Sequence, residues 1–139
     1  MTWRARMITA TTLLFAMQLI HGFIPTAEET EGGSVVGFYG GIGLLLASLV
    51  ALFGVVRARE WGARLAGITG AIVAVGVVLY HALPFKSPVT NPYLGEPVGI
   101  PAWLGVAAAI AAGAWAAWEA RAGGAFGPAE DHGSRTTTV

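Results

Sequence analysis

Four long apolar runs, separated by short polar segments, account for most of the 139-residue chain. None of them contains Asp, Glu, Lys or Arg, and they cover residues 7–24, 35–56, 65–83 and 100–117. An uncharged run of about 18 residues or more is long enough to cross a bilayer as a helix. The pattern predicts an all-α membrane protein, a four-transmembrane-helix bundle in residues 1–120, with a disordered cytoplasmic tail at 121–139.

The distribution of arginine predicts how the chain is oriented in the membrane. The first six residues carry two arginines, the segment 57–64 carries three, and Arg121 begins the tail. The two opposite loops, 26–34 and 84–99, hold Lys86 as their one basic residue. Because short loops rich in Lys and Arg stay in the cytoplasm, we expect both termini there. The abundance of Ala, Gly and Arg suggests a bacterial plasma membrane, crossed several times.

Composition excludes several classes of function. Charged residues make up 12% of the chain and the formal net charge is zero, so nothing indicates a nucleic-acid partner. There are no cysteines, which removes disulfides, thiolate metal sites and thiol catalysis. The sequence contains no nucleophile elbow, phosphate-binding loop or His-Glu-x-x-His pattern. The apolar runs also lack Asp, Glu, Lys and Arg, which argues against a pump or a proton-coupled transporter. Because no catalytic motif is present either, we expect no catalytic residues and favour a protein that is not an enzyme.

Small residues recur at four-residue spacing in two of the runs. The second run contains Gly37 and Gly41, and the fourth contains Gly105, Ala109 and Gly113. Small residues at this spacing allow close backbone contact between membrane helices, where the hydrophobic effect does not favour association. The spacing predicts helix-packing faces, either within the chain or towards another membrane subunit or a second copy.

Two histidines are the strongest candidates for chemistry. His21 ends the first run and His81 ends the third, at similar distances from the arginine-rich segments, so we expect both in one outer layer. Imidazole is a good ligand for zinc, copper and haem iron, and a carboxylate from a loop would complete such a site. The alternative is two interfacial histidines that are hydrogen-bonded to the loops. Candidates for the surrounding outer-face cluster are Gln18, Tyr39, Tyr80, Asn91 and Tyr93, with glutamates at 28, 29, 31 and 96.

The pair His21-Gly22 and the arginine-rich turn between the second and third runs carry a resemblance to a known family. In these residues and in its layout of runs, the chain resembles DoxX-type proteins, which are small four-span bacterial membrane proteins, some of them associated with redox complexes. The resemblance implies an accessory or quinone-linked redox role, with His21 as the residue carried over.

The sequence leaves three functions open. The first is a small integral membrane protein that acts as a partner or accessory subunit of a membrane complex. The second is a haem- or metal-binding redox protein that uses His21 and His81 at the outer face. The third is a binder or carrier of a small apolar ligand, such as a quinone or a lipid.

Overall fold

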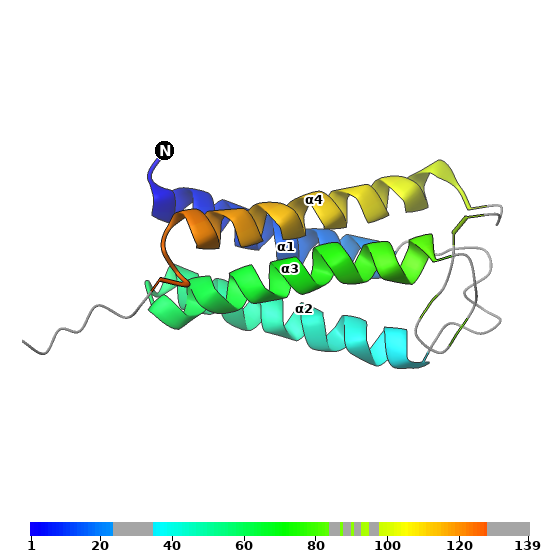
Figure 1. Cartoon of the computed structure of the whole chain (residues 1–139), viewed down its shortest axis with the longest axis horizontal. Helices are drawn as coiled ribbons and strands as arrows, with labels where there is room; N and C mark the ends of the chain where they lie inside the picture. Colours follow the sequence, from blue (N-terminus) through cyan, green and yellow to red (C-terminus); the bar gives the residue numbers. More distant parts are fainter. Residues whose placement is uncertain (24–34, 84–86, 88–89, 91–92, 95–97, 128–139) are drawn as a thin grey trace, which may run out of the picture.

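The computed structural model describes residues 1–23, 35–83, 87, 90, 93–94 and 98–127. Four α-helices form a bundle (Figure 1): α1 (Trp3–Phe23), α2 (Val35–Val56), α3 (Glu60–Ala82) and α4 (Ile100–Ala122). The all-helical prediction is confirmed for these residues.

The order of helix contacts defines a four-cornered bundle. α3 packs against α2 and α4, and α1 packs against the same two helices, whereas α1 and α3 touch at few points. The helices α1 and α3 therefore lie across the diagonal of the bundle. The N-terminus, the α2–α3 turn and the end of α4 gather at one end of the molecule, which we call the arginine end (Figure 1).

The structure corrects the predicted number of membrane spans. Among the described residues, three helical segments are long and apolar enough to cross a membrane: Gly37–Val56, Glu60–Ala82 and Ile100–Ala122. The prediction of four transmembrane helices is therefore wrong, because α1 does not meet this standard. Its first turn carries Arg4 and Arg6, and three threonines, Gln18 and His21 interrupt its apolar residues. The run 7–24 lacks charge, but lack of charge alone does not make a helix sufficiently apolar.

Close backbone approaches hold the three apolar helices together. A Cβ atom added to Gly70 of α3 would lie 2.5 Å from the carbonyl oxygen of Gly113 in α4. Near the α2–α3 turn, a Cβ atom added to Gly62 would lie 2.4 Å from the carbonyl carbon of Gly54. Buried alanines such as Ala66 fill the space beside these contacts. The helices therefore pack at a distance that larger residues would prevent.

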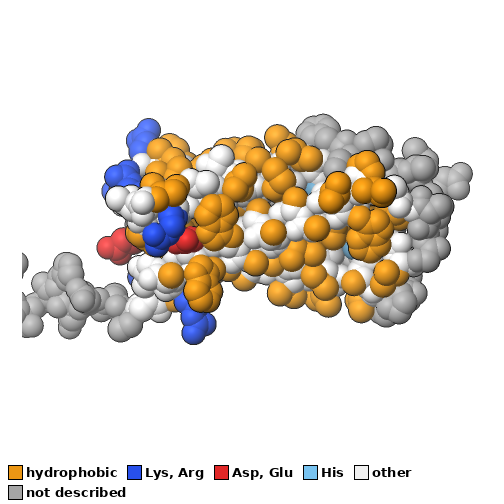
Figure 2. Space-filling view, turned by 90° about the horizontal axis from the view of Figure 1, so that it is seen from above, with side chains coloured by type: hydrophobic (Ala, Val, Ile, Leu, Met, Phe, Trp, Pro, Cys, Tyr) orange, Lys and Arg blue, Asp and Glu red, His pale blue; other side chains and the backbone are white. Residues whose placement is uncertain are grey.

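Most large apolar side chains of α2 and α3 point outwards, as expected for helices surrounded by lipid. Figure 2 shows this apolar surface along the length of the bundle, with the Lys and Arg side chains of the described residues gathered at the arginine end. Those side chains are Arg4, Arg6, Arg57, Arg59, Arg64 and Arg121.

Two helices end in the same type of cap at the arginine end. After α4, the N–H of Ala125 donates to the oxygen of Ala120, and Gly124 adopts a φ of 73°. After α2, the N–H of Arg59 donates to the oxygen of Gly54, and Ala58 adopts a φ of 54°. Both are Schellman caps, which place one residue in the left-handed region. Glycine adopts this conformation readily and alanine does not.

The first residues of the predicted tail belong to the bundle. Arg121 and Ala122 complete α4, and Arg64 of α3 donates a hydrogen bond of 2.7 Å to the carbonyl oxygen of Ala125. Phe126 lies over Gly67 of α3. The rest of the tail, residues 128–139, lies outside the described residues.

Candidate functional site

The two histidines meet on the diagonal of the bundle, at the end opposite the arginines. His21 lies in the last turn of α1 and His81 in the last turn of α3. Their Nε2 atoms are 3.3 Å apart, and the two rings meet edge to face with centroids separated by 5.3 Å. The side chain of His81 is buried. The pair thus occupies the bundle interior between facing helices, which is where helical bundles place metal and cofactor sites.

Aromatic side chains surround His81. The ring of Tyr93 lies 3.9 Å from the His81 ring, centroid to centroid, and Tyr80 lies on another side at 4.8 Å. Trp103 of α4 packs edge to face on Tyr93. The N–H of Tyr93 donates a hydrogen bond of 2.9 Å to the carbonyl oxygen of His81. This hydrogen bond joins Tyr93, which follows α3, to the last turn of that helix.

The separation of the two Nε2 atoms is compatible with two arrangements. A hydrogen bond between neutral imidazoles requires one protonated and one unprotonated Nε2. Alternatively, both atoms are unprotonated and bind one metal ion. In tetrahedral zinc sites the Zn–N distance is about 2.0–2.1 Å, which places two nitrogen ligands about 3.3–3.4 Å apart. The observed 3.3 Å is therefore close to the distance between two adjacent nitrogen ligands of a tetrahedral ion.

The same distance does not suit haem. Two histidines that ligate one haem iron lie on opposite faces of the macrocycle, so a flat ring system has to fit between them. Nε2 atoms 3.3 Å apart leave no room for it. Of the cofactors considered from the sequence, a single metal ion fits this pair and a haem bridging it does not.

The part of the chain that the structure describes contributes two imidazole side chains to this site. It contains no cluster of three or more His, Asp or Glu residues placed to hold a metal. The glutamates at 28, 29, 31 and 96, and Asn91, lie outside the described residues.

The other residues predicted for the cluster have different surroundings. Tyr80 and Tyr93 contact His81, as described above. Gln18 instead joins α1 to α2, since its amide donates to the hydroxyl of Ser48 and to the oxygen of Leu14. Tyr39 is exposed and packs on Phe38. Two of these contacts were not predicted from the sequence, namely Ser48 as the partner of Gln18 and Trp103 as the support of Tyr93. The depth of each residue along its helix could have suggested these contacts, because Ser48 lies at the level of Gln18 and Trp103 lies at the level of Tyr93.

The predicted packing residues divide into two groups. Gly105, Ala109 and Gly113 lie on the buried face of α4, so this small-residue face is used within the chain. On α2, Gly37 lies beneath the ring of Tyr80. Gly41 is exposed, and a Cβ atom there would meet no described atom within 4 Å. Gly41 therefore makes no tight contact in the described part of this bundle.

Comparison with family models, with curated proteins and with solved structures gave no match. The resemblance to DoxX-type proteins stays a prediction, and the function proposed below is based on the geometry of the histidine pair.

Proposed function

We propose that this protein is a small integral membrane protein that binds one transition-metal ion through His21 and His81. The observation that supports the proposal is the 3.3 Å separation of the two Nε2 atoms inside the bundle. In this proposal the arginine end faces the cytoplasm of a plasma membrane, because basic residues remain on that side. The metal site then lies at the end of the bundle opposite the arginines.

The ligand chemistry favours an ion such as Zn²⁺. Imidazole suits zinc, copper and nickel, whereas calcium and magnesium prefer oxygen ligands. The chain has no cysteine, so soft thiolate coordination is excluded. Tyr93 packs on the His81 ring and Trp103 supports Tyr93, which restricts the orientation of one ligand. Such orientation of a ligand by its surroundings strengthens metal binding.

The test is a zinc titration of the purified protein in detergent, read by calorimetry and by metal analysis after desalting. We expect one Zn²⁺ per chain, and loss of that binding in both His21→Ala and His81→Ala. His132→Ala is the matched control, because it removes the third histidine of the chain, and it should bind zinc normally. Zinc binding that survives in the His21→Ala/His81→Ala double variant would refute the proposal, as would equal loss in His132→Ala.

A second candidate function is that of a partner or accessory subunit, as the resemblance to DoxX-type proteins implies. The supporting observation is the exposed surface of α2, where Cβ atoms added to Gly40, Gly41 and Gly43 would meet no described atom within 4 Å. Another membrane helix can approach closely at such a surface. Gly41→Leu should then remove a partner that co-purifies in mild detergent. The matched control is Gly76→Leu on α3, where an added Cβ atom likewise meets no described atom within 4 Å, and this variant should retain the partner.

The geometry gives less support to a carrier of an apolar ligand. Between α3 and α4, the backbones at Gly70 and Gly113 are in contact, and this contact leaves no room for a ligand at that level.

A further inference from the structure

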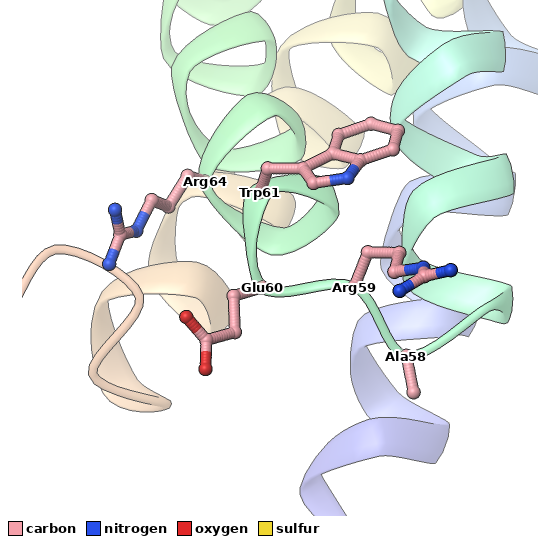
Figure 3. Close-up of a pocket in the computed structure, with 5 residues that line it drawn as sticks. All are labelled: Ala58, Arg59, Glu60, Trp61 and Arg64. Carbon is pink, nitrogen blue, oxygen red and sulfur yellow. The ribbon is translucent and has the colours of Figure 1, made fainter. Parts of the chain in front are cut away.

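The turn between α2 and α3 forms a hollow at the arginine end of the bundle. It has a volume of about 520 Å³ and is lined by Ala58, Arg59, Glu60, Trp61 and Arg64. Figure 3 shows Arg64 and Arg59 on the two sides of the turn, with Glu60 and Trp61 between them. All five residues are exposed. The hollow thus combines two cations, one carboxylate and one indole ring, contributed by the α2–α3 turn and the start of α3.

The positive charge at this end exceeds the negative charge. The described residues contain six arginines, and their acidic residues are Glu60 and Glu119. Glu119 pairs with Arg6. Arg57 lies over the ring of Phe53, and Arg59 and Arg64 line the hollow. The excess of cations favours an anion from outside the described part of the chain.

The hollow also adjoins apolar surface. It lies where α2 ends and α3 begins, and both helices contain segments long and apolar enough to cross a membrane. Phe53 and Val56 of α2 and Ile68 of α3 are exposed near this end. Trp61 is 45% exposed, as is typical of tryptophan at the level of lipid headgroups. An anion that carries acyl chains would place its charge at the arginines and its chains along these residues.

We propose that this hollow binds the headgroup of an anionic phospholipid, with Arg59 contacting the phosphate and Arg64 adding positive charge from the other side of the turn. Arginine binds phosphate oxygens through paired N–H donors, and juxtamembrane basic residues attract anionic lipids. Glu60 disfavours a second negative charge in the hollow and accepts hydrogen bonds from headgroup hydroxyls. The ligand class is therefore a singly charged phospholipid with a hydroxyl-bearing headgroup, such as phosphatidylglycerol.

The test measures lipid binding by the full-length protein in detergent. Native mass spectrometry would compare retention of phosphatidylglycerol with that of phosphatidylcholine, and a titration would give the affinity for each. We expect preferential retention of phosphatidylglycerol, with roughly tenfold weaker binding in Arg59→Gln/Arg64→Gln. Arg59→Gln alone should show part of the loss of lipid binding. This single variant is needed because Arg64 also donates a hydrogen bond to Ala125, so its replacement affects the fold as well.

Arg57→Gln is the matched control, because Arg57 belongs to the same turn but lies over Phe53 and does not line the hollow. It should bind phosphatidylglycerol almost normally. Equal retention of the two lipids would overturn the proposal, and so would equal loss in Arg57→Gln and Arg59→Gln. Inorganic phosphate that competes fully at millimolar concentration would show a site for the free anion and would likewise overturn it. The histidine variants should bind phosphatidylglycerol normally, so the lipid proposal is tested independently of the metal proposal.

Discussion

The arginine end and the histidine end of the bundle both bury polar side chains, but they satisfy them in different ways. At the arginine end, the buried carboxylate of Glu119 accepts hydrogen bonds from Arg6 at 3.0 and 3.1 Å and from Trp115 at 3.1 Å. Trp3 adds a bond of 2.8 Å to its backbone oxygen. At the histidine end, two imidazoles face each other across the diagonal, surrounded by aromatic rings.

The difference separates a structural contact from a candidate site. Glu119 has a full set of donors from its own chain, and its negative charge is balanced by Arg6, so it has no need of a ligand. The histidine pair consists of two groups that are each able to donate or accept a proton and to bind a metal. We therefore expect variants of Glu119 to change stability, and variants of the histidine pair to change binding.

The largest effect on stability is expected from a glycine substitution at the arginine end, which we compare with one at the histidine end. In Gly62→Ala, the new Cβ would lie 2.4 Å from the Gly54 carbonyl carbon, so α2 and α3 have to separate. We expect a loss of roughly 3 kcal/mol from overpacking. Gly22→Ala at the histidine end places its Cβ where no described atom lies within 4 Å, and it should be neutral. Thermal unfolding in detergent measures the stability of both variants. Equal losses of stability in the two would contradict the close contact at the α2–α3 turn.

The next effect concerns the buried carboxylate. Glu119→Ala leaves Arg6 and the Trp115 N–H without their acceptor, at an expected cost of about 2 kcal/mol. Glu60→Gln, which alters the exposed glutamate of the same end, should change stability little. Denaturant unfolding of the two variants tests this order. A smaller loss in Glu119→Ala than in Glu60→Gln would rule out the structural role given to Glu119.

A gain in stability is expected from Ala58→Gly. Ala58 occupies the left-handed position of a Schellman cap, where the equivalent residue after α4 is Gly124. Glycine removes the steric cost of the left-handed conformation, but its greater freedom in the unfolded chain offsets part of this gain. We expect a net increase in stability of roughly 0.5 kcal/mol. The melting temperature should rise slightly. Ala125→Gly, close to the cap that already has its glycine, is the comparison and should not be stabilising.

The smallest effect on stability is expected when both histidines are replaced. In His21→Leu/His81→Leu both members of the pair become apolar, so neither is left buried with a missing partner. Such paired replacement is close to neutral. The melting temperature without metal should match that of the unaltered protein, whereas zinc should no longer raise it. A large loss of stability without metal would show that the pair is mainly structural.

The apolar runs were a better guide to the positions of the helices than to the number of membrane spans. The run 35–56 coincides with α2 (Val35–Val56), because apolar residues fill that helix from end to end. α3 instead begins at Glu60 and includes Arg64, since charged residues are compatible with a helix end that leaves the bilayer. Lack of charge was a poor guide to α1, whose threonines, Gln18 and His21 lower its mean hydropathy.

The positions of the candidate site residues were predicted in part. Depth along the helices was sufficient to place His21 and His81 in one layer, and the structure brings them together. Depth does not reveal which way a side chain faces, because the rotation of each helix is set by contacts elsewhere, such as Gly70 against Gly113. For this reason Tyr39, which was assigned to the cluster, lies on the surface, and Gln18 faces Ser48 of α2.

The ion pair of Arg6 with Glu119 has a consequence for how the chain is made. Its two members are 113 positions apart, so the first helix of the nascent chain emerges long before its acceptor does. The groove that receives α1 is bounded by α2 and α4, and it is complete only after nearly the whole chain has left the ribosome. Final docking of the first helix therefore has to wait until α4 has been made.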